Sequence, residues 1–395
     1  GNLLIIFLAW VATSLMLHRL LVFYPERRRA VVAARKKFIV ARLGDLFLLG
    51  AFILIYLQYA TGDLQVIFDA VKTASSIPPN VELAAIFIVF AALLKSAQFP
   101  TQGWLIEVVD TPTPVSALLH AGLLNAGPFL IIRIAFLIDA AEVAPIVLII
   151  MGGLTALIAS VSYLTQPSVK TALAYSSSAH MGFLLLISGI GVYPAAMLHL
   201  VAHSFYKAHA FLASGSAIET TRASKTAPPK RFGSPFRIMA GILIAFAVYM
   251  GFSILWGINP SDEFSLLATG AMVVMGLAQI IAPALDSDGY LVTTLRTILL
   301  TLLVAASFFT LETGAHHMLY SQLPELSKPN ELTIVLTILT LIVFGAAVLA
   351  QLAGPVIRHH VIWQKLGVHF RNGFYMNAFF DRMTGAFSIH TTSIK

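Results

Sequence analysis

The sequence predicts an all-α protein that crosses a membrane many times, and two properties of the chain indicate this. Hydrophobic residues make up 58% of the 395 residues and charged residues only 11%, whereas soluble domains carry about 25% charged residues. Apolar runs of about 20 residues recur along the chain, and each is long enough to cross a bilayer as a helix. We therefore expect most of the protein surface to face lipid.

Several classes of function are excluded by what the sequence lacks. The chain contains no cysteine, which excludes structural disulfides and iron–sulfur clusters held by thiolates. It also lacks the GxGxxG and GxxxxGK[ST] loops that bind nucleotide phosphates. The net charge of +7 does not predict a nucleic-acid partner, because the basic residues gather in short segments between apolar runs, where they orient a membrane protein.

We expect a membrane domain with eleven spans over residues 1–353, followed by a polar tail over residues 354–395. No shift of composition marks a second globular domain. The chain begins within an apolar run, without an initiating Met or the charged start of a signal peptide, so we expect further spans upstream. The expected spans are 3–23, 38–59, 81–99, 114–138, 145–164, 169–190, 194–219, 237–256, 265–284, 293–311 and 332–353.

The charges between the spans predict an orientation. Basic residues gather after the first and seventh spans, and acidic residues gather after even-numbered spans. Because positively charged loops stay in the cytoplasm, we expect the loops after odd-numbered spans and the tail to be cytoplasmic. The basic residues are Arg27, Arg28, Arg29, Arg35, Lys36, Lys37, Arg222, Lys225, Lys230 and Arg231, and the acidic residues are Asp63, Asp69, Asp139, Glu142, Asp262 and Glu263.

The tail mixes charged and aromatic residues in a pattern typical of a helix at the membrane interface. A helix that packs against a partner subunit has the same pattern, so the sequence leaves both possibilities open. The residues that form the pattern are His359, His360, Trp363, Lys365, Phe370, Arg371, Phe374, Tyr375 and Phe379.

Lys95 stands deep inside the span that begins near Val81. An ionisable group within a span costs at least about 2.5–3.5 kcal/mol on insertion scales. Pro100 soon removes a backbone donor, which predicts a break or kink, and such breaks are tolerated where they line a polar cavity. Alternatively, the span ends at Leu94 and the long side chain of Lys95 reaches the cytoplasmic surface.

The strongest polar group is formed by His199, His203 and Lys207, which are spaced four residues apart. This spacing places them on one face of one helix near the centre of a span, so the face needs water or polar partners. Two histidines four apart can bind zinc, but no cysteine or nearby carboxylate completes such a site, and we expect no metal. Proton transfer fits better, because histidine titrates near neutral pH and a cation held away from water gives up its proton more readily.

Three further polar residues are weaker candidates. His120 stands among leucines on a helix that begins at two prolines, where a satisfied core histidine is the common alternative unless Lys95 is close. Asp45 can pair with Arg42 or, alternatively, with Lys95. Lys170 stands near the cytoplasmic start of a span, and polar residues that continue inward from it can also be simple helix-packing residues. These inward residues are Ser176, Ser177, Ser178 and His180.

Several long motifs resemble those of the proton-conducting, antiporter-like membrane subunits of respiratory complex I and of multisubunit cation/proton antiporters. The resemblance implies inverted repeats of helices with broken spans at the centre, and no cofactor or catalytic chemistry on this chain. The motifs are LLKSAQFPTQGWLIEVVDTPTPVSALLHAGLLNAGPFLIIR at 93–133, RLGDLF at 42–47, SVKTALAYSSSAHMG at 168–182, HLVAHSFYKAHAFLASGS at 199–216 and FYMNAFFDRM near the end.

The resemblance also implies roles for single residues. Lys95 matches a lysine that carries protons at mid-membrane. The residues implied to form a hydrated polar axis are His120, Lys170, His199, His203 and Lys207, with Asp45 as a further candidate.

Two departures from the family pattern argue against a complete antiporter-type pump. Family members carry a glutamate directly after the tryptophan that matches Trp10, but Val11 stands there. The last channel helix of the family usually carries a lysine or glutamate, whereas the matching stretch, 237–257, has no charge beyond its start.

The variant LLHAGLLNAG and the acidic Asp110 before the PTP motif resemble a shorter branch, the membrane subunits of DAB inorganic-carbon pumps. This implies a chain that conducts protons or another cation to drive a large cytoplasmic, zinc-containing, carbonic-anhydrase-like subunit of the DabA type. One alternative is a proton-pumping subunit of a complex I-like oxidoreductase or antiporter. Another is a membrane anchor whose channel has decayed, although the retained His199, His203 and Lys207 stripe argues against decay.

Overall fold

The computed structural model describes residues 1–74, 76–108, 111–214, 230–257, 264–288, 290–326, 329–357 and 359–383. Within these ranges the chain is helical, and strand-like pairing is limited to isolated bridges between Asn2 and Asp63 and between Arg231 and Ser287. The expected all-α fold is confirmed. The predictions that fall outside the described residues concern Asp110, Arg222, Lys225, Asp262, Glu263 and the tail beyond residue 383.

Contacts between helices divide the chain into two compact units. The first unit contains every residue that the sequence predicts for the polar pathway. The first unit comprises Gly1–Gly189, His199–Ser216 and Val368–Lys395, and the second comprises Ile190–Leu198 and Ala217–Gly367.

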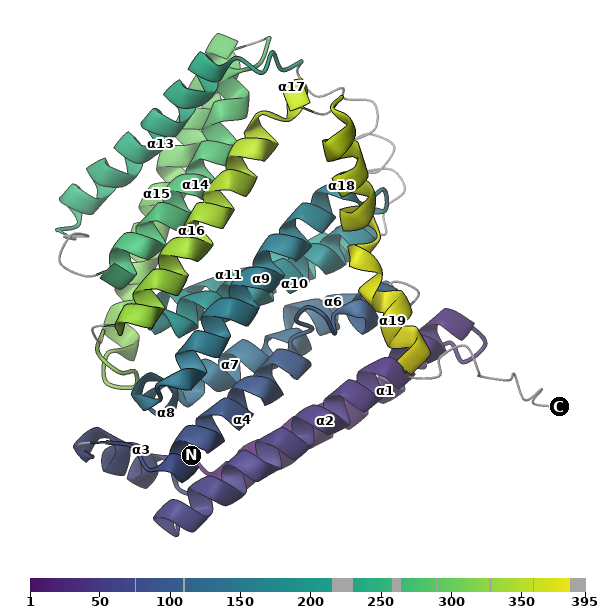
Figure 1. Ribbon diagram of the computed structural model, residues 1–395, viewed down its shortest axis with the longest axis vertical. Coiled ribbons are helices and arrows are strands. Elements are labelled where there is room, and N and C mark those ends of the chain that lie inside the picture. The colour runs from purple at the N-terminus through teal and green to yellow at the C-terminus, as the bar shows by residue number, and fades with distance from the viewer. Residues whose placement is uncertain are drawn as a thin grey trace. The chain divides into compact units, whose positions relative to one another are not determined.

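The first unit is built from α1 to α10, most of α11, and the end of the described chain (Figure 1). Helix α2 packs along α1 and α4, and α10 packs along α9. The bounds are α1 Leu3–Leu21, α2 Arg28–Tyr59, α3 Leu64–Thr73, α4 Pro79–Lys95, α5 Gly103–Glu107, α6 Thr113–Ala121, η2 Leu123–Asn125, α7 Ala126–Arg133, α8 Ala135–Ala140, α9 Val143–Thr165, α10 Val169–Gly189, α11 Tyr193–Ala213, η3 Gly373–Tyr375 and α19 Met376–Met383.

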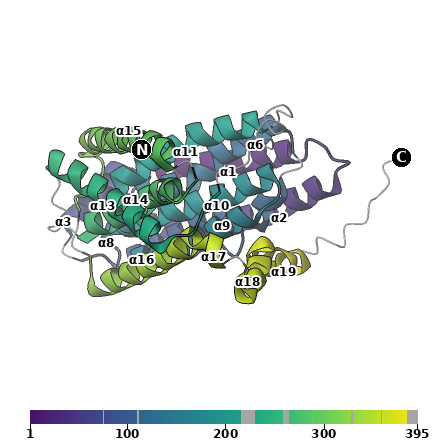
Figure 2. The same cartoon turned by 90° about the horizontal axis from the view of Figure 1, so that it is seen from above.

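The second unit contains four long helices, of which α14 packs against the other three (Figures 1 and 2). The approach of α13 to α14 depends on Gly241, where a Cβ atom would lie 2.5 Å from the Cα of Ala282. Asp286 accepts hydrogen bonds from the backbone N–H groups of Gly233 (2.8 Å) and Ser234 (2.9 Å) and so ties the end of α14 to the start of α13. The bounds are α13 Pro235–Leu255, α14 Phe264–Leu285, α15 Tyr290–Leu319, α16 Glu331–Leu352 and α17 Gly354–Ile357, and α18 Val361–Arg371 follows.

Eight helical segments of the described chain are long and apolar enough to cross a membrane. Helices α4, α10 and α11 occupy three further expected positions, but α4 has only 17 residues, and α10 and α11 carry the serines, histidines and lysines of the predicted pathway. The protein is therefore a multi-pass membrane protein, and the count of eleven spans is not confirmed.

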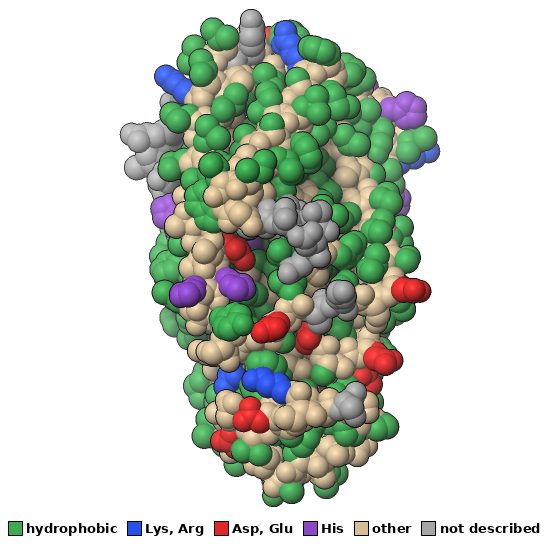
Figure 3. All heavy atoms as spheres, turned by 90° about the vertical axis from the view of Figure 1, so that its left-hand side faces the viewer, with side chains coloured by type: hydrophobic (Ala, Val, Ile, Leu, Met, Phe, Trp, Pro, Cys, Tyr) green, Lys and Arg blue, Asp and Glu red, His purple; other side chains and the backbone are tan. Residues whose placement is uncertain are grey.

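The exposed side chains of the long helices are largely hydrophobic. On the face seen in Figure 3, hydrophobic side chains predominate over the upper part, and charged side chains are few there. Leu243, Phe246, Leu299 and Leu303 are among the exposed hydrophobic residues of α13 and α15. A surface of this kind suits contact with lipid, which does not penalise exposed apolar groups.

The first basic cluster does not lie in a loop, which corrects the expected start of the second span at residue 38. Helix α2 begins at Arg28, and Lys36 and Lys37 are buried within it. Alanine, arginine and lysine are strong helix formers, so a basic segment rich in alanine extends the helix instead of ending it. Polar partners from other helices then allow the two lysines to be buried.

The predicted break after Lys95 is confirmed. Helix α4 ends at Lys95, Ala97 has a left-handed φ of 52°, and the next helix begins at Gly103. The backbone groups freed by the break are satisfied from neighbouring helices, because the N–H of Phe99 donates to Thr155 Oγ1 (3.1 Å) and Ser178 Oγ donates to the Ala97 carbonyl (2.9 Å). Such partners are what a broken helix needs inside a membrane. The span expected over 114–138 is also interrupted, between α6, η2, α7 and α8.

Close packing of α9 and α10 positions the polar stripe of α10. A Cβ atom at Gly152 would lie 2.6 Å from the Gly182 carbonyl oxygen and 2.7 Å from the Leu186 nitrogen. Small residues at a helix interface allow backbones to approach each other in this way. The position of α10 is thereby fixed, with Ser177 and Ser178 fully buried.

Candidate functional site

Lys95 is the residue at which α4 breaks, and its side chain turns towards α1. It is 9% exposed, and its Nζ donates a hydrogen bond to the Trp10 carbonyl oxygen at 3.0 Å. The same Nζ lies 4.2 Å from the centre of the Trp10 ring, a distance at which the ring face attracts a cation. This burial contradicts the alternative in which Lys95 reaches the cytoplasmic surface.

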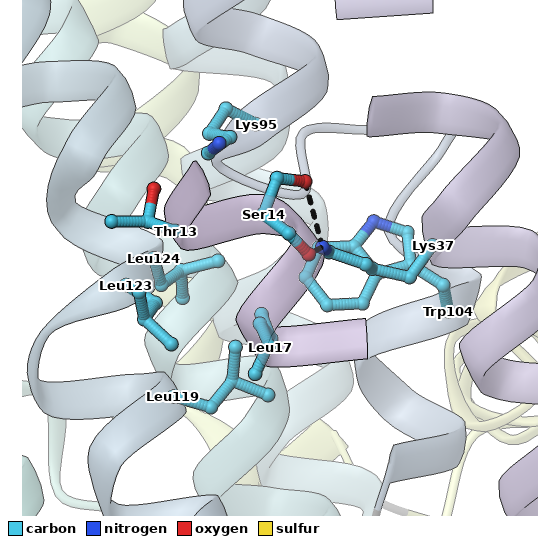
Figure 4. Close-up of a pocket in the computed structure, with 9 residues that line it drawn as sticks. All are labelled: Thr13, Ser14, Leu17, Lys37, Lys95, Trp104, Leu119, Leu123 and Leu124. Carbon is cyan, nitrogen blue, oxygen red and sulfur yellow. Dashed lines mark hydrogen bonds between the residues drawn. The ribbon is translucent and has the colours of Figure 1, made fainter. Parts of the chain in front are cut away.

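Lys37 of α2 lies next to Lys95. Its Nζ donates to the Ser14 carbonyl oxygen (2.6 Å) and to Ser14 Oγ (2.8 Å). Both lysines line a small cavity of about 10 Å³ together with Trp104 and residues of α1 and α6. Figure 4 shows the two lysine side chains approaching this cavity with Ser14 between them.

Asp45 forms the expected local ion pair with Arg42, with 2.6 Å between Oδ2 and Nη2. Both Asp45 and Arg42 also interact electrostatically with Lys37 and Lys95. Helix α2 therefore places one carboxylate, Asp45, and two cations, Lys37 and Arg42, around Lys95.

His120 of α6 is buried against α10 and α11. Its Nδ1 lies 2.9 Å from Ser177 Oγ, and its ring stacks on Phe211, with centroids 4.1 Å apart and an angle of 12° between the planes. Ser177 Oγ also donates to the Leu173 carbonyl oxygen. The side chain is held by α10 and α11, and it interacts electrostatically with Lys207.

The three residues of the α11 stripe face α10, as their spacing predicts. His199 Nε2 lies 2.8 Å from His180 Nδ1, and the ring of His203 lies 5.2 Å from that of His180. His203 is 3% exposed, and neither of its ring nitrogens has a hydrogen-bond partner within the described residues. A buried imidazole without a hydrogen-bond partner is unfavourable unless water reaches it.

Lys207 completes the stripe and has no exposed surface. Its Nζ donates to Ser176 Oγ (2.8 Å) and to the Leu173 carbonyl oxygen (3.1 Å), both on α10. The Leu173 carbonyl oxygen also accepts from Ser177 Oγ, which contacts His120. One carbonyl group therefore links Lys207 to Ser177. The side chains linked by these contacts are His120, Ser177, His180, His199, His203 and Lys207, of which His180 and His199 are only partly buried.

Lys170 lies in the first turn of α10 and is half-buried. Its Nζ donates to Thr113 Oγ1 of α6 at 3.3 Å. Along the same helix, Lys170 precedes Ser177 by about two turns.

Two residues of the site were missed or undervalued by sequence reasoning. The sequence predicts a loop at Lys37, whereas Lys37 lies within α2, and the run of strong helix formers around it was the available signal. The sequence predicts His180 only as one member of a polar stripe, and the structure shows that its side chain contacts His199. Its spacing of three residues from Ser177 was the available signal for a shared face.

A second buried ionic group ties the tail to the broken helix. Lys36 of α2 forms ion pairs with Glu107 of α5 (2.6 Å) and with Asp381 of α19. Asn377 of α19 accepts a hydrogen bond from Lys36 Nζ and donates one to Glu107 Oε1 (2.6 Å). The tail therefore packs on α2 and α5, next to a cavity of about 150 Å³ lined in part by Gln102, Arg371 and Asn377.

The broken helices and buried lysines of this multi-pass membrane protein are the features that the sequence resemblance implies for antiporter-like membrane subunits. Residues 1–229 match the family described as NADH:quinone oxidoreductase/Mrp antiporter, transmembrane, and the chain belongs to this family. Among solved structures, it resembles the Mrp complex from Dietzia sp. DQ12-45-1b with a TM-score of 0.63 and 21% identity, covering 100% of this chain and 47% of that one. The antiporter-like fold is thereby confirmed.

Curated relatives with similar sequences include inorganic carbon transporter subunits and respiratory subunits. The probable inorganic carbon transporter subunit DabB of Hydrogenovibrio crunogenus is 46% identical over 58% of this chain and 45% of the relative. The probable subunit DabB2 of Halothiobacillus neapolitanus is 34% identical over 98% of this chain and 70% of the relative. NADH-quinone oxidoreductase subunit L of Escherichia coli is 36% identical over 55% of this chain and 36% of its own length. This chain spans about half the length of several curated relatives that it matches.

Proposed function

We propose that the chain belongs to the membrane subunit of an energy-coupled inorganic-carbon uptake pump. The observation that carries this proposal is the similarity to the probable carbon transporter subunit DabB2, which extends over 98% of the chain. In this function the protein conducts protons or another cation and so drives the hydration of carbon dioxide to bicarbonate by a carbonic-anhydrase-like, zinc-containing cytoplasmic subunit.

The proposed path runs through the buried residues of the first unit. Lys95 acts as a switchable charge beside the broken helix, near Asp45. The group around Lys207 carries protons between α10 and α11, since the buried ring of His203 needs water as a hydrogen-bond partner and ionisable residues within spans mark proton relays. The residues that we assign to the path are Asp45, Lys95, His120, Lys170, His199, His203 and Lys207.

The proposed orientation places the first basic segment and the tail on the cytoplasmic side of a bacterial inner membrane. Arg27 and Glu26 lie between α1 and α2, next to the basic start of α2. The tail helix α19 is held to α2 through Asp381, so it belongs on the same side as that segment. A cytoplasmic partner subunit then finds the tail at the membrane surface.

A second candidate function is a proton-pumping subunit of a complex I-like oxidoreductase or of a multisubunit antiporter. The similarity to NADH-quinone oxidoreductase subunit L and the fold shared with the Mrp complex favour it. The loss of the family glutamate at Val11 argues against it, because that carboxylate pairs with the lysine that matches Lys95.

Purification of the native complex separates the two functions. The protein is tagged in its own cells, extracted in mild detergent and analysed for bound metals and for visible absorbance. The carbon pump predicts a soluble partner that brings zinc, together with carbon uptake that an uncoupler abolishes. Flavin or iron–sulfur absorbance in the purified complex, without zinc, contradicts the proposal and supports the respiratory alternative.

A further inference from the structure

Lys37 is a buried cation to which the proposed path gives no role. It is 3% exposed and lines the same cavity as Lys95 (Figure 4). Burial of an ammonium group is unfavourable without a compensating charge. Two such groups beside one small cavity therefore need an explanation beyond packing.

The two lysines bind to one face of α1. Lys95 donates to the carbonyl oxygen of Trp10, and Lys37 donates to the carbonyl and hydroxyl oxygens of Ser14. Trp10 and Ser14 are four residues apart and so lie one above the other on the helix. Val11, which stands where the family carries a glutamate, lies between them in the sequence.

The charges around this face do not balance when both lysines are protonated. The groups that act on Lys37 are Lys95, Arg42 and Asp45, and His18 of α1 is a further titratable group that Lys37 affects. Asp45 is the one carboxylate among them, and it is already paired with Arg42 at 2.6 Å. Like charges at short range disfavour each other, so the face holds one excess proton more easily than two.

We propose that Lys37 and Lys95 share one proton along this face of α1 and pass it between α2 and α4, in place of the family's lysine–glutamate pair. In the step, one N–H bond of the Lys95 ammonium breaks and one forms on the neutral amine of Lys37, and the positive charge moves with the proton. The Ser14 hydroxyl accepts a hydrogen bond from Lys37 when the lysine is charged, and it can donate one to the Lys37 nitrogen when the lysine is neutral. Both amines border the same cavity of about 10 Å³, which is at the lower limit of the volume that holds one water.

A purely structural role for Lys37 makes a different prediction. If Lys37 only ties α2 to α1 through Ser14, arginine can replace it, because the guanidinium group has five N–H donors for the same oxygens. Arginine does not release its proton in proteins, so it cannot take part in an exchange. The variant Lys37→Arg therefore separates the two roles.

The experiment uses the protein in its native complex, in sealed membrane vesicles, and rests on the proposed function only for its second readout. Proton entry is followed with a pH-sensitive dye over a range of external pH, and inorganic carbon uptake is followed in the same vesicles. We expect Lys37→Arg and Lys37→Met to slow proton entry by about 100-fold, the usual size of a lost proton-transfer group. We expect Lys37→His to retain part of it with the optimum at lower pH, because histidine titrates near 6.5 and lysine near 10.4. The control Lys72→Arg changes an exposed lysine of α3 and should leave proton entry unchanged.

Each outcome decides the matter. Proton entry at the wild-type rate in Lys37→Arg, at a normal membrane level, overturns the proposal. If Lys37→Arg does not reach the membrane, an unshifted pH profile for Lys37→His overturns it instead. Wild-type proton entry without carbon uptake contradicts the proposed carbon pump but still tests Lys37. An unmodified protein that admits no protons overturns the proton exchange by Lys37, and its carbon uptake then tests the proposed function separately.

Discussion

Lys95 is held inside the protein by a carbonyl oxygen and the face of an aromatic ring. Among the described residues, the nearby carboxylate of Asp45 forms its ion pair with Arg42 and not with Lys95. A cation with such weak compensation can lose its proton without losing a salt bridge. That property suits a residue that changes its charge during transport.

Replacement of Lys95 by methionine should therefore abolish transport and leave folding intact. Methionine removes a buried charge whose insertion costs at least about 2.5–3.5 kcal/mol, so the thermal stability of the purified complex should stay equal or rise. Lys95→Arg should also fail in transport, because its charge cannot be switched off. Normal transport by Lys95→Met, or its loss from the membrane while the exposed control Lys72→Met is retained, would refute this role.

At this scale, spacing alone predicted part of the site. The interval of four residues places His199, His203 and Lys207 on one face, and the structure has them there. Lys37 could not be predicted, because its burial depends on Ser14, a residue of another helix. The pairing of His180 with His199 likewise depends on the contact between α10 and α11.

Helices α9 and α10 pack more closely than ordinary side chains allow, and this packing sets the position of the polar stripe. Gly152→Ala places a Cβ atom 2.6 Å from the Gly182 carbonyl oxygen and 2.7 Å from the Leu186 nitrogen. Both of these neighbouring atoms belong to the backbone of α10. We expect a loss of stability of about 1–3 kcal/mol, the usual cost of overpacking, measured by thermal unfolding in detergent. The matched control is Gly276→Ala in α14, where a Cβ atom meets nothing within 4 Å. Equal stability of the two variants would show that α9 and α10 can separate without loss.

The tail is attached by a buried ionic group and not only by apolar contact. Lys36→Met leaves the carboxylates of Glu107 and Asp381 without their cation, and breaking a buried pair costs about 3–5 kcal/mol. We expect the tail to become sensitive to protease in the purified complex. The double variant Lys36→Met with Asp381→Leu should restore protection, because Glu107 is partly exposed and can be solvated.

The control for this attachment is Arg382→Gln, which changes an exposed neighbour on α19 and should leave the protease pattern unchanged. An intact tail in Lys36→Met would contradict the account of its attachment. Sequence patterns predicted a tail at an interface or on a partner, and could not predict its contact with α2 and α5, because Lys36 and Asp381 lie far apart in the chain.

For the whole molecule, the orientation in the membrane can be tested simply because the chain contains no cysteine. Glu26→Cys lies between α1 and α2, and Gln65→Cys lies on α3 beyond the other end of α2. We expect a membrane-impermeant maleimide to label Glu26→Cys only in inverted vesicles and Gln65→Cys only in intact cells without their outer membrane. The opposite pattern would reverse the proposed topology, and labelling of both from one side would contradict the span formed by α2.

The apolar runs were sufficient to predict a helical membrane protein, and Pro100 after Lys95 predicted a broken span, since both signals depend on local sequence. The number of spans was less predictable, because α4, α10 and α11 carry the polar residues of the pathway and are too short or too polar to be distinguished by hydropathy. Helices of this kind are buried by their neighbours, and their place in the membrane depends on the assembled fold.

The most direct test of the proposed function is growth of cells that lack other carbon uptake, at ambient carbon dioxide, with the native complex carrying Lys207→Met. Lys207 has no exposed surface and bonds only to Ser176 and Leu173 among its described hydrogen bonds, so methionine should fit without unfolding the protein. With membrane levels matched to wild type, we predict no growth for Lys207→Met and partial growth for Lys207→His, which can still exchange a proton. Full growth of the Lys207→Met cells at a normal membrane level would contradict proton transfer through this group of residues.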